Sequence, residues 1–345
     1  MRYILVLILA CILPFYSCNS NGKQDDNIPD ENKPYTLAYL PTWKMPYTPD
    51  WEKITHLCIA FGLVQSDGSL DLTEVNKYRS IINLAQSNRV KVLLSIGGGG
   101  TTNFSAAILT KNKRDFLIEN LEKTLKDYGF DGIDVDYEEW EGGPGGYGIS
   151  DSAKREALEQ LYKELRAKIG KEKLITAAVS ADWNDGKWGF YNCYNNTMHQ
   201  YLDFVSLMIY DETGPWESSQ VGQHASWEFF ENSINFWLNE RELPKEKLLA
   251  GLPFYGYRFK SEDTSKDAEG MSYKDILINY PDVDAHLSDN VGLLFYNGML
   301  TVKRKADYIK NNQLGGVMFW EISQDSDDKD KSLLGLIYKS FTNKE

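Results

Sequence analysis

The chain has 345 residues, of which 42% are hydrophobic and 13% aromatic, and its 50 acidic residues outnumber its 37 basic residues to give a net charge of −13. This length suffices for one large domain, since a single α/β barrel takes about 250 residues. The acidic balance excludes nucleic acids and anionic membrane surfaces as expected partners. The negative charge does not exclude a neutral polysaccharide as a partner.

The N-terminus has the pattern of an export signal. One arginine precedes an apolar run over residues 4–15, which is too short to span a membrane and predicts a signal peptide over residues 1–17. The small residue before Cys18 resembles the cleavage site of bacterial lipoproteins, and Cys11 is a rival position with a shorter apolar run. The resemblance implies a lipid on Cys18 and a polar, acidic tether over residues 18–34. We therefore expect an exported protein, held in the bacterial cell envelope by its lipid alone, in the outer membrane and facing outward.

Eight short apolar runs recur along the rest of the chain, with helical patterns between them. Their near-continuous hydrophobicity is typical of parallel strands that are covered on both faces. The expected strands are Thr36–Leu40, His56–Leu63, Lys91–Ile96, Gly132–Asp136, Leu174–Ser180, Phe204–Tyr210, Leu248–Phe254 and Gly316–Trp320. The expected helices are Leu72–Asn88, Asn112–Tyr128, Ser152–Ile169, Trp227–Asn239, Lys303–Asn312 and Lys331–Phe341.

This alternation of strand and helix predicts a (β/α)8 TIM barrel, an α/β fold, over residues 35–345. An open doubly wound sheet is the alternative, but it would need a nucleotide-binding fingerprint, and the sequence has no Gly-x-Gly-x-x-Gly spacing. Gly97–Gly100 is not followed by the Lys-Ser/Thr of a phosphate loop, so it indicates a tight backbone passage instead. Residues 258–300 separate the seventh strand from its helix and predict a short insertion on the rim of the barrel.

The most informative segment is residues 131–138, which read Asp-Gly-Ile-Asp-Val-Asp-Tyr-Glu. In a strand, the period of two puts Asp134, Asp136 and Glu138 on one face. Three neighbouring carboxylates cannot all stay ionised, so at least one pKa must rise, and a carboxylic acid that stays protonated near neutral pH can protonate a leaving group. A calcium loop would need glycine where Glu139 stands. An acidic surface strand would leave the β-branched residues between the acids on an exposed sheet.

This acidic run resembles the signature of family 18 glycoside hydrolases, the chitinase family. Four more motifs resemble those of the family's third, sixth, seventh and eighth strands, in the same order: Ser95-Ile-Gly-Gly98, Met208-Ile-Tyr-Asp211, Gly251-Leu-Pro-Phe-Tyr-Gly256 and Gly315-Gly-Val-Met-Phe-Trp320. The resemblance runs from about Tyr35 to the C-terminus. It implies the same barrel, with the reacting groups at the C-terminal ends of the strands.

The resemblance also implies a retaining hydrolysis in which the substrate's own 2-acetamido group is the nucleophile. Glu138 would protonate the glycosidic oxygen and would later act as the base on water. Asp136 would bind the acetamido N–H, and Asp134 would tune Asp136 by sharing a proton with it. Tyr210 would donate its hydroxyl to the acetamido oxygen, unless it is a core tyrosine with a satisfied hydroxyl.

Other residues near the strand ends would bind or support the sugar site. Asp211 would contact the sugar, or else cap a helix, and Trp320 would form the floor beneath it, or else pack in the core. The same cleft is predicted to contain Met208, Tyr39, Phe61, Trp183 and Tyr255, and the loop tryptophans available for further sugars are Trp43, Trp140 and Trp216. Structural support is expected from Asp131, Ser95, Gly97 and Gly98.

No metal or other cofactor is expected, because carboxylates suffice for this chemistry and the four histidines show no metal-ligand spacing. The expected partner is a polymer or oligomer of β-1,4-linked N-acetylglucosamine, bound by a monomer. One alternative is an endo-β-N-acetylglucosaminidase acting on N-glycan cores, a group that often has another acid where this chain has Tyr137. The other is a non-catalytic, chitin-binding, lectin-like protein, a group that typically loses the acid at the position of Glu138. Cys58 and Cys193 do not indicate a disulfide framework, and Cys58 is expected to be a buried free thiol.

Overall fold

The structure is a computed structural model that describes residues 33–44, 47–139, 148–181, 193–216 and 220–342. Pro34–Glu345 forms one compact unit. The predicted signal peptide, Cys18 and most of the predicted tether lie outside the described residues, as do Trp140 and Trp183.

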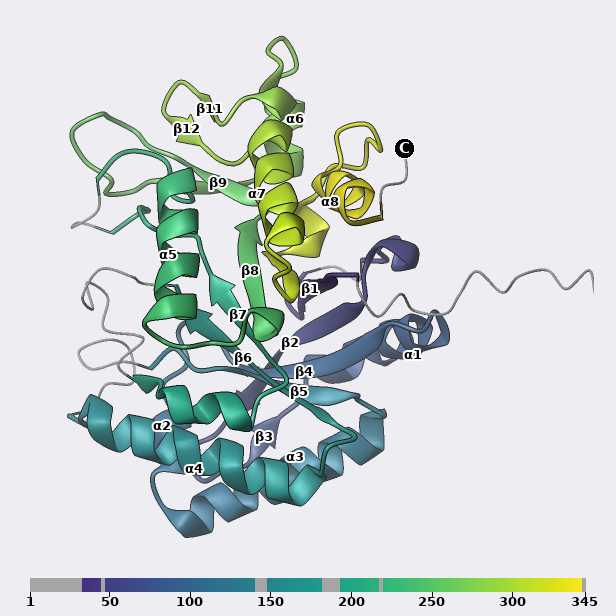
Figure 1. The fold of residues 1–345 in the computed structure, drawn as a ribbon, viewed down its shortest axis with the longest axis vertical. Coiled ribbons are helices and arrows are strands. Elements are labelled where there is room, and N and C mark those ends of the chain that lie inside the picture. The colour runs from purple at the N-terminus through teal and green to yellow at the C-terminus, as the bar shows by residue number, and fades with distance from the viewer. Residues whose placement is uncertain (1–32, 45–46, 140–147, 182–192, 217–219, 343–345) are drawn as a thin grey trace, which may run out of the picture. The chain divides into compact units, whose positions relative to one another are not determined.

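Eight parallel strands close into a barrel (Figure 1). They are β1 (Tyr35–Pro41), β2 (His56–Val64), β4 (Lys91–Gly97), β5 (Gly132–Asp136), β6 (Leu174–Ser180), β7 (Phe204–Met208), β8 (Leu248–Pro253) and β13 (Gly316–Trp320). β1 closes the ring by pairing with both β2 and β13. The predicted (β/α)8 barrel is confirmed, and each predicted strand matches an observed strand to within two residues at either end.

Helices cover the outside of the barrel (Figure 1). They are α1 (Arg79–Ser87), α3 (Lys111–Tyr128), α4 (Asp151–Ile169), α5 (Trp227–Asn239), α7 (Met299–Asn311) and α8 (Leu333–Thr342), with the short α2 (Phe104–Ile108) before α3. The described part of the chain has no helix that is both long and apolar enough to cross a membrane.

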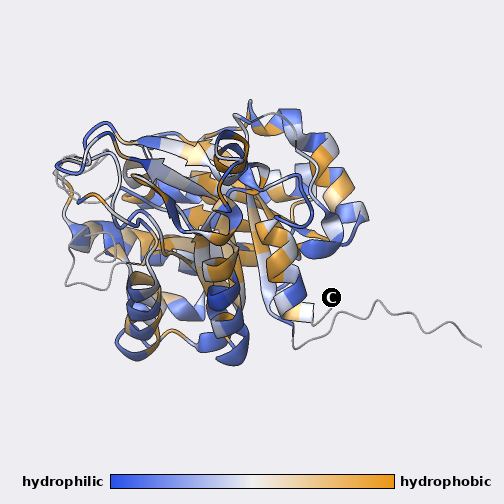
Figure 2. Cartoon of the chain, turned by 90° about the horizontal axis from the view of Figure 1, so that it is seen from above, coloured by the Kyte–Doolittle hydropathy of each residue, from blue (hydrophilic) through white to orange (hydrophobic). Residues whose placement is uncertain are grey.

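Two apolar layers explain why the strands are hydrophobic on both faces. Leu37, Tyr39 and Cys58 belong to a cluster inside the barrel, whereas the alternate positions Ala38 and Leu40 belong to the larger cluster that includes helix residues. Figure 2 shows hydrophobic segments gathered in the interior and hydrophilic ones on the outer helices. As the strand period requires, successive side chains enter different layers. Cys58 is a buried free thiol, as predicted, and Cys193 is one as well.

The insertion between β8 and α7 forms a small antiparallel sheet in the order β10-β9-β12-β11 (Figure 1). A short helix, α6, stands between β10 and β11 in the chain. Its elements are β9 (Tyr255–Arg258), β10 (Glu269–Ser272), α6 (Tyr273–Asn279), β11 (Asn290–Val291) and β12 (Leu294–Phe295). The predicted bounds of 258–300 need correction, because β9 begins only two residues after β8 and α7 already begins at Met299. Leu300 is therefore part of α7.

The predicted helix Leu72–Asn88 is wrong over its first half. Residues 75–78 form a 3-10 turn, and the α-helix begins only at Arg79. Tyr78 ends the turn with a buried ring, and its hydroxyl donates to the carbonyls of Pro41 and Lys44. This long-range anchoring of Tyr78 against the end of β1 competes with a regular helix at that point.

Candidate active site

β5 carries the acidic run into the centre of the barrel. The register pairs Asp134 with Ser95 of β4 and Thr176 of β6, and it pairs Asp136 with Gly97. Both aspartates are buried, and the residues between and before them belong to the helix-facing cluster. Glu138 follows two residues after the end of β5 and is half-buried. Asp134 and Asp136 therefore lie in the strand as predicted, whereas Glu138 lies in the loop that follows it.

Three hydroxyl groups surround the Asp134 carboxylate. Tyr39 and Ser95 donate to Oδ2, each at 2.7 Å, and Thr176 donates to Oδ1 at 2.6 Å. Burial raises the pKa of Asp134, while these hydrogen bonds to the ionised form oppose the rise. Sequence reasoning did not single out Thr176. The available signal was a hydroxyl residue at an inward position of an otherwise apolar strand.

Asp136 differs from Asp134 in having a free acceptor atom. Among the described residues, no group hydrogen-bonds to its buried Oδ1. Burial raises the pKa of Asp136 well above its usual value, and the charges of Glu138 and Asp134 raise it further. An unpartnered buried oxygen is costly, so Asp136 is poised to accept a hydrogen bond from a ligand.

Glu138 is the acid best placed to exchange a proton near neutral pH. Burial raises its pKa to about 7, the negative charge of Asp211 raises it as well, and the backbone N–H of Gly99 lowers it. Both Glu138 and Asp136 line a cavity of about 280 Å³ at the end of the barrel. A general acid works best when its pKa lies near the working pH.

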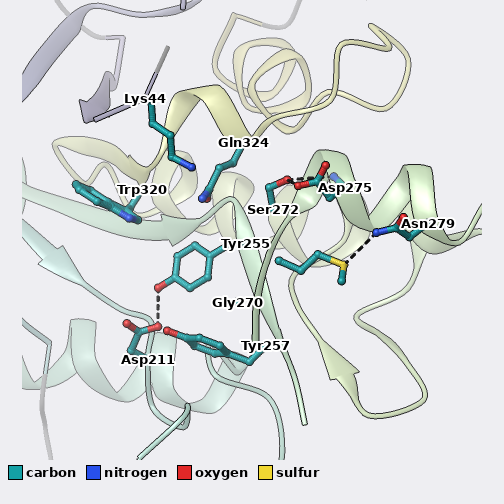
Figure 3. Close-up of a pocket in the computed structure, with 11 residues that line it drawn as sticks. Lys44, Asp211, Tyr255, Tyr257, Gly270, Ser272, Asp275, Asn279, Trp320 and Gln324 are labelled. Atoms are coloured by element: carbon teal, nitrogen blue, oxygen red, sulfur yellow. Dashed lines mark hydrogen bonds between the residues drawn. The ribbon is translucent and has the colours of Figure 1, made fainter. Parts of the chain in front are cut away.

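Asp211 lies in the loop after β7, which corrects the predicted strand Phe204–Tyr210. The strand ends at Met208, where the N–H of Ile209 donates to the carbonyl of Leu207, and Asp211 adopts a left-handed φ of 64°. The Tyr255 hydroxyl donates to Asp211 Oδ1 at 2.5 Å (Figure 3). Asp211 therefore caps no helix; it is held beside the cavity by a side chain from the insertion.

The cavity gathers most of the predicted sugar-binding residues. Its lining includes Tyr39, Phe61, Asp136, Glu138, Met208, Tyr210, Asp211, Tyr255 and Trp320, together with Trp43 and Met318. Burial raises the pKa of the Tyr210 hydroxyl well above its usual value, so Tyr210 stays protonated as a donor. Trp320 stacks on Phe61 with 5.8 Å between ring centroids, and Trp43, which is 60% exposed, lies 6.1 Å from Trp320. These rings form an aromatic floor and edge.

A second cavity of about 570 Å³ continues toward the insertion (Figure 3). Asp211, Tyr255 and Trp320 line both cavities. The additional lining comes from Lys44, Tyr257, Gly270, Met271, Ser272, Asp275, Asn279 and Gln324. Because they share these three residues, the two cavities adjoin each other at the end of the barrel.

The backbone next to the acids is tightly fixed. Gly97 and Gly98 have φ angles of 106° and 88°, and the N–H of Gly98 donates to the carbonyl of Asp136 at 2.8 Å. A Cβ atom at Gly97 would lie 2.1 Å from that same carbonyl oxygen, so only glycine fits. Glu139, whose role was not predicted, accepts from the N–H groups of Phe104 and Ser105, both at 2.7 Å, at the start of α2.

Two predicted residues lie away from the cleft. Asp131 sits at the opposite end of β5, where it accepts from the N–H of Val92 and from Lys91. Trp216 packs against Tyr257, with 6.2 Å between ring centroids, and lines neither cavity. Within the described ranges, no group of three or more His, Cys, Asp or Glu side chains is arranged to hold a metal ion.

Comparison with known proteins identifies the family. The model of glycosyl hydrolases family 18 matches residues 25–325. Class V chitinase CHIT5a of Medicago truncatula is 26% identical over an alignment of 365 positions, which covers 93% of this chain and 94% of the relative. Endochitinase 1 of Metarhizium robertsii is 27% identical over 294 residues, covering 73% of this chain and 66% of the relative.

A solved structure agrees with these matches. The crystal structure of a chitinase from Bacteroides thetaiotaomicron superimposes with a TM-score of 0.79 at 29% identity, over 90% of this chain and 97% of that one. The family match covers the barrel and all of the acids described above. The chain therefore belongs to family 18 of the glycosyl hydrolases.

Proposed function

We propose that this glycoside hydrolase cleaves β-1,4-linked N-acetylglucosamine chains, chitin or chito-oligosaccharides, with retention of configuration and with assistance from the substrate. One observation carries the proposal: Asp136 presents a buried oxygen, with no hydrogen-bond partner in the described part of the chain, in the same cavity as an acid whose pKa is near 7. An acetamido N–H supplies the missing donor. The chitinases among the relatives favour this class of substrate.

In the first step, Glu138 donates its proton to the glycosidic oxygen while the acetamido oxygen of the sugar attacks the anomeric carbon. The glycosidic bond breaks, and a cyclic oxazolinium ion forms. Asp136 accepts the acetamido N–H and offsets the developing positive charge, and Tyr210 donates its hydroxyl to the acetamido oxygen. Among the residues that the structure describes, the Tyr210 hydroxyl otherwise has only a weak acceptor, the Met318 sulfur at 3.7 Å.

In the second step, ionised Glu138 takes a proton from water as the water oxygen attacks the same carbon, and the oxazolinium ring opens. Glu138 thereby regains the proton it lost. The three hydroxyl donors favour the ionised form of Asp134, which leaves on Asp136 the proton that the two aspartates share in the free enzyme. This proton passes to Asp134 when the acetamido N–H binds Asp136, so that Asp136 is ionised in the first step. We propose that the two carboxyls titrate as one unit.

Substrate comparison tests this function directly. Chito-oligosaccharides are expected to be cleaved, whereas cello-oligosaccharides of equal length lack the acetamido group and should remain intact. A high-mannose glycoprotein in the same assay distinguishes an endo-β-N-acetylglucosaminidase. The Tyr137 hydroxyl lies within 2.6 Å of Ser105 on α2, so position 137 supplies no further acid. Release of the N-glycan, with no cleavage of chito-oligosaccharides, would overturn the proposal.

We also propose that the enzyme is a surface lipoprotein anchored through Cys18. The support is the short apolar run, the small residue before Cys18 and the polar stretch that precedes the barrel. Acyl chains bury methylene groups that contribute about 0.8 kcal/mol each, so several chains hold a protein firmly. Fractionation of Cys18→Ala beside the wild type is the test, and a variant that stays with the membrane would contradict the anchor.

A further inference from the structure

Among the described residues, two lysines on the outer helices are completely buried, Lys305 on α7 and Lys154 on α4. Lysine is almost never buried in this way unless its amino group has partners. The Lys305 Nζ donates to the backbone carbonyl of Ala225 and to Oδ1 of Asn297, both at 2.7 Å. The Lys154 Nζ has no hydrogen-bond partner in the described part of the chain. The two lysines therefore form a matched pair, one with specific contacts and one without.

The burial of Lys305 costs free energy. Loss of hydration on burial lowers the pKa of its ammonium group to about 7, and the charges of Asp289 and Glu212 oppose the shift. The ring of Phe230, whose centroid lies 5.1 Å from Nζ, also attracts the ammonium group. An apolar side chain of similar length would avoid the loss of hydration, and such replacements of buried charges are often neutral or stabilising. Stability alone therefore does not explain why a lysine stands at this position.

The Ala225 carbonyl is the point at which α7 and the insertion contact the segment that leads into α5. The buried side-chain amide of Asn297 donates to the same carbonyl oxygen at 3.1 Å, so Lys305 and Asn297 bind it together and bind each other. Two residues earlier, the side-chain amide of Gln223 donates to the carbonyl of Tyr296 in the insertion at 2.5 Å. This segment is therefore anchored on both sides of residue 224.

His224, the residue between these two anchors, contacts the wall of the cavities. One of its ring nitrogens lies 3.3 Å from Oδ1 of Asp211, and the other lies 3.1 Å from the carbonyl oxygen of Tyr255. The Tyr255 hydroxyl donates to the same Asp211 oxygen, and Figure 3 shows Asp211 between Tyr255 and Tyr257. Asp211 and Tyr255 line both cavities. A displacement of His224 would therefore move the junction of the two cavities.

We infer that Lys305, together with Asn297, is a positioning residue for the sugar-binding cavities. It fixes Ala225, and through the adjacent His224 it fixes the junction of the two cavities. This inference rests on the proposed function, in which a sugar chain lies across that junction. The hydrogen bonds of Lys305 in the described structure do not reach the acidic run, and Lys305 lines neither cavity. Its effect therefore falls on the binding of substrate rather than on proton transfer.

Kinetics separate positioning from a purely structural role. Lys305→Met keeps the length of the side chain but removes its donors. KM for a chito-oligosaccharide that spans both cavities should rise by up to about tenfold, which corresponds to about one hydrogen bond to the substrate, with kcat changed less than about twofold. KM for a short substrate that fills only the cavity with Glu138 should change less. A purely structural loss would reduce the amount of folded enzyme and the apparent kcat for both substrates, and it would leave KM unchanged.

The second buried lysine supplies the matched control. Lys154→Met removes an equally buried amino group that has no hydrogen-bond partner in the described structure. Both values of KM should equal those of the wild type. A rise in KM as large as that of Lys305→Met would mean that the loss of any buried lysine disturbs the cavities, and it would overturn the inference.

Amide hydrogen exchange tests the same inference without an assay of activity. In the full-length Lys305→Met enzyme, the amides of residues 223–226 should exchange faster than in the wild type, because the segment has lost one of its anchors. In Lys154→Met their exchange should not change. Unchanged exchange in this segment, or an unchanged KM in a folded Lys305→Met enzyme, overturns the inference. A wild type that cleaves no chito-oligosaccharide contradicts the proposed function, whereas the exchange rates still decide whether Lys305 fixes the segment.

A second variant keeps the inference testable if Lys305→Met does not fold. Asn297→Ala leaves Lys305 its bond to Ala225 and removes both contacts of the amide. KM for the long substrate should then rise in the same direction but by a smaller factor, and residues 223–226 should again exchange faster. If neither variant folds, the pair is a requirement of the whole fold, and the positioning role is wrong.

Discussion

The carboxylates at the two ends of the barrel differ in their partners. At the amino ends of the strands, Asp203 accepts the N–H of Ile175 at 2.7 Å and pairs with Arg166 at 2.6 Å. At the carboxyl ends, Asp134, Asp136 and Glu138 take part in no ion pair of the described structure, and the pKa of each is raised. A carboxylate that is matched by cations and N–H groups stabilises the fold, whereas one buried without a cation is available for chemistry.

The largest expected effect follows from replacing the acid with the pKa near 7. Glu138→Gln keeps the shape of the side chain but has no proton to donate, so kcat should fall by about 10³-fold. Binding of chito-oligosaccharides, measured by calorimetry, should be nearly unchanged. The matched acid-to-amide variant at the other end, Asp203→Asn, should keep kcat and lose about 1 kcal/mol of unfolding free energy. Substantial residual activity in Glu138→Gln would remove Glu138 from the role of acid.

A second variant separates catalysis from stability at one residue. Asp136→Asn should lower kcat by about a hundredfold, because it loses the charge that offsets the oxazolinium ion. The folded-state pKa of Asp136 is raised, so the native state holds this proton more tightly than the unfolded state does. Stability is then complete below the unfolded pKa and falls as the pH rises through the folded pKa.

The thermal midpoint of Asp136→Asn should therefore exceed that of the wild type at pH 8, where the asparagine carries no buried charge. At pH 4 the difference should be much smaller, because both states of the wild type then bind the proton to a similar degree. A variant that is less stable than the wild type by the same amount at both pH values would argue against a raised pKa at Asp136.

The pH profile of the wild type should reveal the raised pKa of Glu138, an acid at the carboxyl ends of the strands. Because the pKa of Glu138 is raised to about 7, kcat/KM should decline above about pH 7, by up to tenfold for each further pH unit. Stopped assays on a soluble chito-oligosaccharide between pH 4 and 9 provide the measurement. A rate that stays constant up to pH 9 would mean that no group with this pKa must be protonated.

The smallest expected effect concerns Glu139, which joins the acidic loop to α2. Glu139→Ala leaves the N–H groups of Phe104 and Ser105, at the start of α2, without their acceptor, and an unpaired buried donor costs about 1–3 kcal/mol. The freed loop should lower kcat only a few-fold, with KM little changed. Chemical denaturation and steady-state kinetics on the same preparation measure both effects, and a loss of activity as large as that of Glu138→Gln would make Glu139 part of the reaction itself.

The sequence predicted the barrel and the central acids because both depend on local patterns. Continuous apolar strands and a period of two place Asp134 and Asp136 inward without knowledge of any neighbour. The contacts of Thr176 and Glu139 were missed because each joins segments that lie far apart in the chain. The insertion sheet was missed because β11 and β12 have only two residues each, too few to show a period.

The initial product of chito-oligosaccharide cleavage tests the central claim most directly. Real-time proton NMR of the reducing-end anomeric signal, recorded before mutarotation, reads the stereochemistry of the step in which water attacks. Attack of water on an oxazolinium ion, with Glu138 as base, predicts that the β-anomer appears first. An α-anomer as the first product would require direct attack of water on the substrate, and it would contradict a reaction assisted by the acetamido group.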